Sequence, residues 1–261
     1  MFGASRFGRV QRWQRAAKRG TLPIRLTIAM STSAGQSLLT RLVRRTVASQ
    51  LMMTALLFLP AGSLKYWPGW GYLAANLVSG LWVYIYFYRR DPQLLERRLL
   101  KREKFSEQKL IQILWRALSI VFLVLAGADY RFGWSRGLFG PVPWWLIVPA
   151  LLIVLVGYHL IFRVFKANSF AASVVQVEAG QAVIDTGPYR FVRHPLYTGS
   201  FIIWISSPLA LGSFVLTPVF LLLLPILAFR LSNEEKVLRR DLPGYVAYCQ
   251  RTRYRLIPFM W

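Results

Sequence analysis

The sequence predicts an all-α, polytopic integral membrane protein without a Rossmann domain. Of its 261 residues, 55% are hydrophobic and only 16% are charged, whereas soluble domains carry about a quarter charged residues. The apolar residues come in blocks of about 20, the length that crosses a bilayer as a helix. No glycine-rich dinucleotide loop opens a helix after a strand. A single cysteine, Cys249, excludes an internal disulfide and a cysteine-clustered metal site, and we expect no metal.

The charge of the chain is strongly positive. A formal net charge of +23 arises from 33 lysine and arginine residues against 10 aspartate and glutamate residues. A soluble protein this basic would suggest nucleic-acid binding. Here the basic residues flank the apolar blocks, as the positive-inside rule expects. We therefore expect membrane lipids, and not nucleic acid, as partners, and the sequence leaves the oligomeric state open.

Residues 1–45 form a basic N-terminal arm. The arm carries lysine and arginine but no carboxylate, because the first acidic residue of the chain is Asp91. Its apolar content is too low for independent folding, so we favour a poorly ordered extension or a start residue assigned too early. An arm that lies on anionic lipid and a targeting peptide are the two alternatives.

Residues 46–163 are expected to contain four membrane helices with a surface helix among them. The four predicted spans cover residues 46–64, 69–88, 110–128 and 143–163. After the second span, Asp91 can cap a helix and Pro92 suits its first position. The leucines of this segment share one helix face and its basic residues lie elsewhere, which predicts an amphipathic helix near 91–108 on the cytoplasmic membrane surface.

The apolar stretch 196–229 is too long for one helix. Gly212 and Pro218 predict a helical hairpin with its turn near 212–217, which brings the total to about six spans. Basic residues concentrate in the arm and in segments 89–109, 164–194 and 230–261. An even number of spans then places both termini on the cytoplasmic side.

The hairpin is expected to bring two polar regions together at the cytoplasmic membrane edge. One region ends in a run with two arginines and His194 directly before Pro195, a residue that can begin a helix whose free backbone groups bind ligands. The other begins at Arg230, and Glu234 shares its helix face four residues later. Taken singly, these residues have ordinary explanations as membrane anchors, an interfacial histidine or a surface ion pair. Their convergence on one patch favours a ligand site.

Three sequence blocks resemble the signature of a known family. They read G-P-Y-x-x-V-R-H-P-x-Y over 187–197, R-x-x-x-E-E over 230–235, and G-Y-x-x-Y followed by R-L-I-P over 244–258. Together they resemble the isoprenylcysteine carboxyl methyltransferase family, within a wider group that includes the phospholipid N-methyltransferases. Segments 168–171 and 181–184 resemble its bacterial branch.

This resemblance implies an S-adenosylmethionine-dependent methyltransferase whose catalytic region is 164–261. By position it implies Arg230, Glu234 and Glu235 as catalytic residues, with Arg230 facing the methyl acceptor. It leaves open which glutamate does the family's work, although the spacing from Arg230 favours Glu234. The cofactor contacts that it implies are Gln176, Gln181, Ala182, Val183, Ile184, Tyr189, His194, Pro195, Leu196, Tyr197 and Glu234.

The expected reaction is methyl transfer to a lipidic or isoprenoid acceptor at the cytoplasmic face of a bacterial membrane. A carboxylate is the favoured acceptor group. A phospholipid amine and a thiol are alternative acceptors within the same superfamily. A membrane reductase is a second reading, because sterol reductases share the Y-x-x-Y and R-x-I-P blocks and part of the architecture. A non-catalytic membrane scaffold with the same fold is the third.

Overall fold

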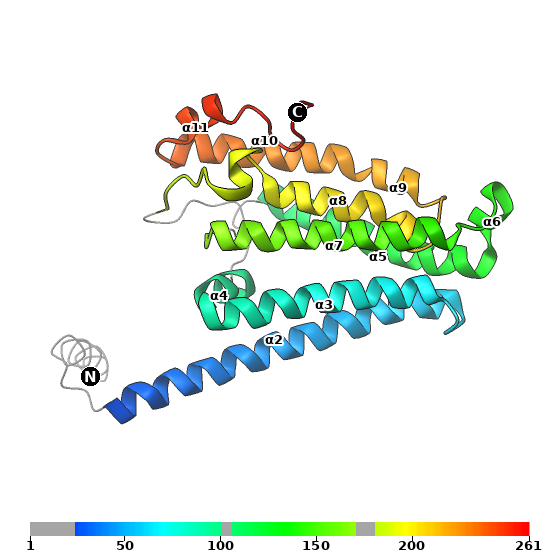
Figure 1. The fold of residues 1–261 in the computed structure, drawn as a ribbon, viewed down its shortest axis with the longest axis horizontal. Coiled ribbons are helices and arrows are strands. Elements are labelled where there is room, and N and C mark those ends of the chain that lie inside the picture. Colours follow the sequence, from blue (N-terminus) through cyan, green and yellow to red (C-terminus); the bar gives the residue numbers. More distant parts are fainter. Residues whose placement is uncertain (1–23, 101–105, 171–180, 261) are drawn as a thin grey trace. The chain divides into compact units, whose positions relative to one another are not determined.

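The computed structural model describes residues 24–100, 106–170 and 181–260, and the regular secondary structure of these residues is entirely helical, with no strand (Figure 1). The predicted all-α class is therefore confirmed. The elements are α2 (Ile24–Ala61), α3 (Trp67–Arg90), α4 (Pro92–Leu100), α5 (Ser106–Phe132), α6 (Trp134–Phe139), α7 (Trp144–Ala167), the 3-10 turn η1 (Gly187–Arg190), α8 (Pro195–Ala210), α9 (Thr217–Leu221), α10 (Leu223–Asp241) and α11 (Tyr245–Arg251).

The chain divides into two compact units, residues 1–47 and 48–261. The first unit holds the beginning of α2, which starts at Ile24 and so extends into the segment expected to be a poorly ordered arm. Residues 1–23 of that arm lie outside the described part. The site and its supporting helices all belong to the second unit.

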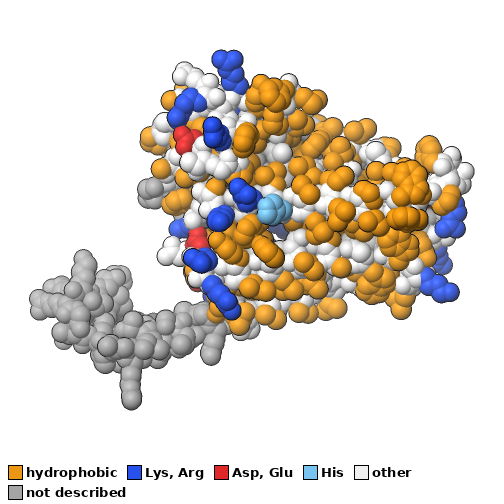
Figure 2. Space-filling model, in the orientation of Figure 1, with side chains coloured by type: hydrophobic (Ala, Val, Ile, Leu, Met, Phe, Trp, Pro, Cys, Tyr) orange, Lys and Arg blue, Asp and Glu red, His pale blue; other side chains and the backbone are white. Residues whose placement is uncertain are grey.

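Four helical segments are long and apolar enough to cross a membrane: Leu38–Ala61, Lys109–Phe132, Trp144–Ala167 and Thr217–Asp241. They include the first, third and fourth predicted spans and the second arm of the hairpin. The remaining two predicted spans fall in α3 and α8. Helix α3 has 24 residues, but its tyrosines and tryptophans lower its hydropathy, and α8 has only 16 residues. Figure 2 shows hydrophobic side chains over most of the visible face, as expected for helices that contact lipid.

The predicted hairpin is present. Helix α8 ends at Ala210 and α9 begins at Thr217, so the turn lies where it was expected. Gly212 adopts a left-handed φ of 71° there, a conformation that glycine tolerates best. On the return, Leu227 and Leu231 of α10 pack in one cluster with Tyr197 of α8. The hairpin therefore brings α10 back beside the start of α8.

Polar contacts with α5 and α6 hold the turn between α8 and α9. The buried carboxylate of Asp129 accepts hydrogen bonds from the backbone N–H and the hydroxyl of Ser135, at 2.7 and 2.5 Å. The Ser135 hydroxyl oxygen in turn accepts a hydrogen bond from the backbone N–H of Val215, at 3.0 Å. The last turn of α5 and the first turn of α6 thereby hold the turn of the hairpin in place.

Helix α7 lies between α3 and α8 (Figure 1). It meets α8 through two facing glycines. A Cβ atom added to Gly157 would stand 2.9 Å from the carbonyl oxygen of Gly199, and one added to Gly199 would stand 2.9 Å from that of Gly157. Small residues at such a crossing let two membrane helices approach closely. The crossing fixes the position of α8, and with it the start of the hairpin.

Helix α4 begins as the sequence predicts and is tied to the end of α7. The Asp91 carboxylate accepts a hydrogen bond from the backbone N–H of Leu94 at 3.1 Å, which confirms the predicted cap. The Arg97 guanidinium donates to the carbonyl oxygen of Ser169 at 2.9 Å, and Arg98 lies over the ring of Phe165. The helix expected near 91–108 includes residues 101–105, which lie outside the described part, and its place on the membrane surface stays a prediction.

Candidate active site

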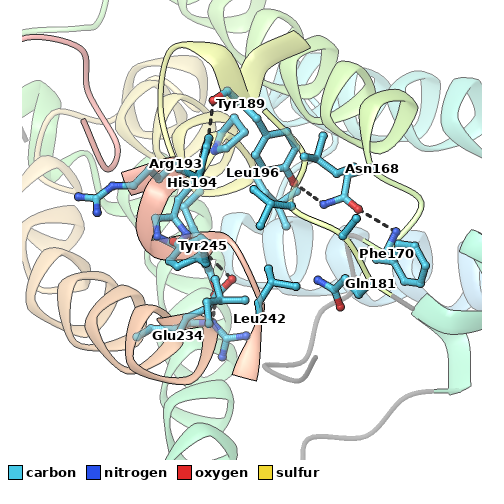
Figure 3. Close-up of a pocket in the computed structure, with 18 residues that line it drawn as sticks. Asn168, Phe170, Gln181, Tyr189, Arg193, His194, Leu196, Glu234, Leu242 and Tyr245 are labelled. Carbon is cyan, nitrogen blue, oxygen red and sulfur yellow. Dashed lines mark hydrogen bonds and ion pairs between the residues drawn. The ribbon is translucent and has the colours of Figure 1, made fainter. Parts of the chain in front are cut away.

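A cavity open to solvent lies where α7 ends and α8 begins, with α10 and α11 across from them (Figure 3). It has about 850 Å³ of free space including its mouth. It brings together nearly all residues that the sequence placed in a cofactor or acceptor site. Those that line it are Gln181, Ala182, Val183, Ile184, Tyr189, His194, Pro195, Leu196, Tyr197, Arg230 and Glu234.

Two predicted site residues stand apart from this set. Gln176 lies outside the described residues, so its place in the site stays a prediction. Glu235 does not line the cavity, although it directly follows Glu234, which does. The two adjacent carboxylates therefore have different surroundings.

A chain of hydrogen bonds joins Arg230, Tyr197 and Glu234 on one wall of the cavity. The Arg230 Nε–H donates to the Tyr197 hydroxyl oxygen at 2.7 Å, and that hydroxyl donates to Glu234 Oε2, also at 2.7 Å. Arg230 and Glu234 are one helical turn apart on α10, and Tyr197 faces them from the first turn of α8. The phenol therefore sets the orientation of both charged groups.

Glu235 is buried within a cluster of cationic side chains. Its side chain is 4% exposed, and its carboxylate lies 3.1 Å from Arg193 and 3.3 Å from Arg255. His194 Nε2 lies 3.2 Å from Glu235 Oε1, and Arg239, one turn along α10, lies at 3.8 Å. A buried carboxylate is tolerated when it is paired in this way. Glu235 thus joins the turn before α8 to the end of the chain.

Backbone hydrogen bonds reinforce that junction. The N–H groups of Arg193 and His194 donate to the carbonyl oxygens of Tyr254 and Arg255, both at 2.9 Å. The Thr198 hydroxyl donates to the carbonyl oxygen of Leu256 at 2.7 Å. The segment that reads R-L-I-P therefore binds the R-H-P turn directly. The two sequence blocks therefore form one hydrogen-bonded unit.

The opposite wall of the cavity combines the 181–184 segment with α11. Val183 packs against Leu242, Tyr245 and Tyr248, and Gly244 opens α11 with a left-handed φ of 84°. These contacts place the backbone of the connection beside the cavity. The segment has no regular secondary structure, so its peptide groups do not take part in a helical or sheet hydrogen-bond pattern.

Tyr189 is held by residues on both of its sides. Asn168 Nδ2 donates to the Tyr189 hydroxyl oxygen at 3.0 Å, and the Tyr248 hydroxyl donates to the Tyr189 carbonyl oxygen at 2.7 Å. Burial raises the pKa of Tyr189 to about 12. The phenol is therefore neutral at physiological pH and is available as a hydrogen-bond donor.

The Tyr245 hydroxyl is buried without a hydrogen-bond partner among the described residues. Tyr245 lines the cavity and is only 4% exposed. A buried polar group left without a partner costs about 1–3 kcal/mol, and a ligand that accepts its hydrogen bond removes this cost. Burial also raises the pKa of Tyr245 well above its usual value, so the group stays a donor. This is the clearest sign that the cavity is built for a polar ligand.

Sequence reasoning identified the block that contains Tyr245 but gave that residue no role in the site. The spacing G-Y-x-x-Y was the available signal, because it places both tyrosines on adjacent turns of a helix. The other lining residues that it missed are Asn168, Phe170, Arg193, Leu238, Leu242 and Tyr248. Within the described ranges, no three His, Cys, Asp or Glu side chains gather as a metal site.

One curated relative shares sequence with about half of the chain. It is the Delta(14)-sterol reductase TM7SF2 of Mus musculus, which is 30% identical over 141 residues. The match covers 48% of this chain and 34% of the reductase, so the chain spans about a third of that protein's length.

A family model matches a part of the chain that includes most of the cavity. The matched residues, 149–240, contain α7 from its second turn, the connection with η1, the hairpin and both glutamates of α10. The family is described as the Isoprenylcysteine carboxyl methyltransferase (ICMT) family. Its bacterial branch stays a prediction. Over residues 149–240 the chain thus carries the sequence pattern of the isoprenylcysteine carboxyl methyltransferase family, which confirms the resemblance drawn from the R-H-P and R-x-x-x-E-E blocks.

Proposed function

We propose that this protein is an integral membrane methyltransferase that uses S-adenosylmethionine and acts on a lipidic acceptor at the cytoplasmic membrane face. One observation carries the proposal. The hydrogen-bonded chain of Arg230, Tyr197 and Glu234 forms a cavity wall within the segment that matches the family. The concentration of basic residues in the connections at this end supports a cytoplasmic location for the site.

The residues of the cavity fit the cofactor. S-adenosylmethionine supplies an activated methyl group on a sulfonium, and it carries an ammonium group, ribose hydroxyls and an adenine ring. Glu234 is a carboxylate that can accept hydrogen bonds from the ammonium or from the ribose. The unpartnered Tyr245 hydroxyl can donate to the cofactor, and apolar side chains such as Leu196 and Leu242 can cover its adenine. The 181–184 segment, which lines the cavity beside Tyr245, adds backbone donors and acceptors.

Arg230 is suited to hold the acceptor. A guanidinium binds a carboxylate through two parallel hydrogen bonds, which fixes the angle of the carboxylate as well as its distance. Tyr197 holds the guanidinium through its Nε and thereby restricts its orientation beside the cavity. Methyl transfer by in-line displacement needs mainly this kind of positioning together with the exclusion of water. A small isoprenoid carboxylate is the acceptor that this arrangement favours.

The proposal is tested by methyl transfer from radiolabelled S-adenosylmethionine into lipids, with the full chain in membranes. The acceptors offered are an isoprenoid carboxylic acid, an aminophospholipid and a lipophilic thiol. We expect transfer to the carboxylic acid, with a product that mild alkali hydrolyses as an ester. We expect Arg230→Ala to lower the transfer rate by about 10²–10³, and Arg240→Ala, at an exposed arginine on the same helix, to preserve it. Transfer to none of the three acceptors by folded protein would contradict the proposal.

A membrane reductase is the second candidate, because the chain shares sequence with a sterol reductase. A reductase needs a nicotinamide cofactor, so titration with NADPH separates the two functions. Saturable NADPH binding without binding of S-adenosylhomocysteine would replace the methyltransferase by a reductase. Binding of neither nucleotide would favour a scaffold that keeps the fold.

A further inference from the structure

A second groove lies on the other side of the turn that begins α8. It is lined by α7 and by η1 with the residues that follow it, and it has about 1190 Å³ of free space including its open side. Pro195 belongs to the walls of both the groove and the cavity, whereas Arg230 and Glu234 line only the cavity. The groove is therefore distinct from the cavity, and it borders the cavity at Pro195 without including Arg230 or Glu234.

The groove is lined by both apolar and basic side chains. Val156 and Leu160 of α7 and Phe191 after η1 supply apolar side chains, and Phe191 is 64% exposed. Arg163 on α7 and Arg190 in η1 supply two guanidinium groups, with His159 beside them, one helical turn from Arg163.

The two arginines of the groove have no carboxylate partner in the part of the chain that the structure describes, and no acidic side chain lines the groove. Two arginines that line the same groove suit an anionic group such as a phosphate, which guanidinium groups bind through charge-assisted hydrogen bonds. The charge of the groove is complementary to an anion.

The groove runs along α7 from the expected membrane surface toward the interior of the bilayer, as a bound lipid would. Arg163 lies in the last turns of the candidate span Trp144–Ala167, at the end of the helix where a membrane surface would be. Val156 lies seven residues earlier, which is about 10 Å deeper along the helix. A lipid whose phosphate lies at Arg163 and Arg190 would therefore place its acyl chain along Val156 and Leu160.

We propose that this groove binds one anionic phospholipid, with the phosphate held by Arg163 and Arg190 and an acyl chain packed along α7. The net positive charge of the groove selects an anionic over a zwitterionic headgroup, because a zwitterionic lipid adds its own cation next to the two arginines. The bound lipid would fill the space between α7 and the η1 turn and so support the wall that contains Pro195.

The test uses the full chain in detergent and native mass spectrometry with three probes: dioleoylphosphatidylglycerol, dioleoylphosphatidylcholine and inorganic phosphate. The variant Arg163→Gln/Arg190→Gln removes both charges at exposed positions and keeps most of the side-chain volume. Lys166→Gln, at an exposed lysine of α7 that does not line the groove, is the matched control. The thermal midpoint in lipid-free detergent verifies that each variant is folded.

We expect the wild type to retain phosphatidylglycerol roughly fivefold more than phosphatidylcholine, and the double variant to lose this preference. The Lys166→Gln control keeps it. Equal retention of the two lipids by the wild type, or an equal loss in the control, would overturn the site. Complete displacement of phosphatidylglycerol by millimolar inorganic phosphate would overturn the lipid as its occupant. Binding of S-adenosylhomocysteine is measured in parallel, and its failure alone would bear on the methyltransferase and not on this groove.

Discussion

Glu234 and Glu235 are neighbours on α10 and face different sides of the helix. Glu234 lines the cavity and accepts a hydrogen bond from Tyr197, whereas Glu235 is buried against His194 and three arginines. The sequence could not assign one function to one glutamate. The arrangement separates them: Glu234 lines the cavity, whereas Glu235 lies in a buried ion cluster outside it, and this difference supports Glu234 as the proposed ligand-binding carboxylate.

We expect replacement of Glu235 to reduce the stability of the fold more than it reduces the affinity for a ligand. Glu235→Gln leaves Arg193 buried without its carboxylate, and removal of one partner of a buried ion pair costs about 3–5 kcal/mol. We expect the thermal midpoint in detergent to fall by roughly 10 °C. Asp241→Asn, at the exposed end of the same helix, serves as the control and changes the midpoint little. A stable Glu235→Gln protein would show that the cluster does not hold the two segments together.

Tyr197→Phe removes only the hydroxyl that bridges Arg230 and Glu234. Hydrogen bonds to charged groups are worth about 1.5–3 kcal/mol, so we expect kcat/KM for methyl transfer to fall roughly 10- to 100-fold. The fold is preserved, because the ring still packs with Leu227 and Leu231. Tyr86→Phe, at a tyrosine of α3 that packs against Phe162, is the matched control. Unchanged kinetics in Tyr197→Phe would mean that the bridge does not orient the two groups.

Arg230→Ala is expected to act on the reaction rather than on the cofactor. If Arg230 stabilises the transition state as other preorganised donors do, its loss lowers the rate by about 10²–10³. S-adenosylhomocysteine binding changes much less, because the acceptor-side charge is the group removed. Arg230→Lys keeps the charge but not the paired geometry, so it restores only part of the rate. A fully active Arg230→Ala enzyme would exclude this residue from acceptor binding.

The crossing of α7 and α8 is expected to be sensitive to a single methyl group. In Gly157→Ala the new Cβ would lie 2.9 Å from the backbone oxygen of Gly199, so the two helices must separate, at a cost of about 1–3 kcal/mol. Gly80→Ala on α3 meets no atom within 4 Å and is expected to be neutral or slightly stabilising. Thermal midpoints of the two variants in the same detergent give the comparison. Equal midpoints would contradict a close approach of α7 and α8.

The sequence predicted correctly that the two polar regions of the cavity lie close together, and the reason is physical. The length of the 196–229 block required a hairpin, and a hairpin returns the chain to the start of α8, so Tyr197 and the region around Glu234 were expected at the same end of the hairpin, where the structure joins them. The N-cap at Asp91 was equally local, since it depends on a side chain and a backbone three residues apart. Features set by chain connectivity and local geometry were therefore predictable.

Other features depend on how a helix is rotated about its axis. A step of one residue turns a helix by about 100°, so the packing of α10 decides whether Glu234 or Glu235 faces the cavity. The four-residue spacing from Arg230 favoured Glu234 but could not establish how α10 packs. The unpartnered hydroxyl of Tyr245 depends on three segments that meet in space. The groove lined by Arg163 and Arg190 joins a helix to a distant turn, and no motif marked it.

The most direct test of the account is calorimetric titration of the purified full chain with S-adenosylhomocysteine. Three proteins are compared: the wild type, Glu234→Gln, and Glu96→Gln, at a glutamate of α4 that does not line the cavity. The account predicts saturable binding to the wild type and to Glu96→Gln, and an affinity at least about tenfold lower in Glu234→Gln, because the lost carboxylate held a cation or hydroxyl of the ligand. Folded wild-type protein that does not bind, or three equal affinities, would contradict the assignment of this cavity to S-adenosylmethionine.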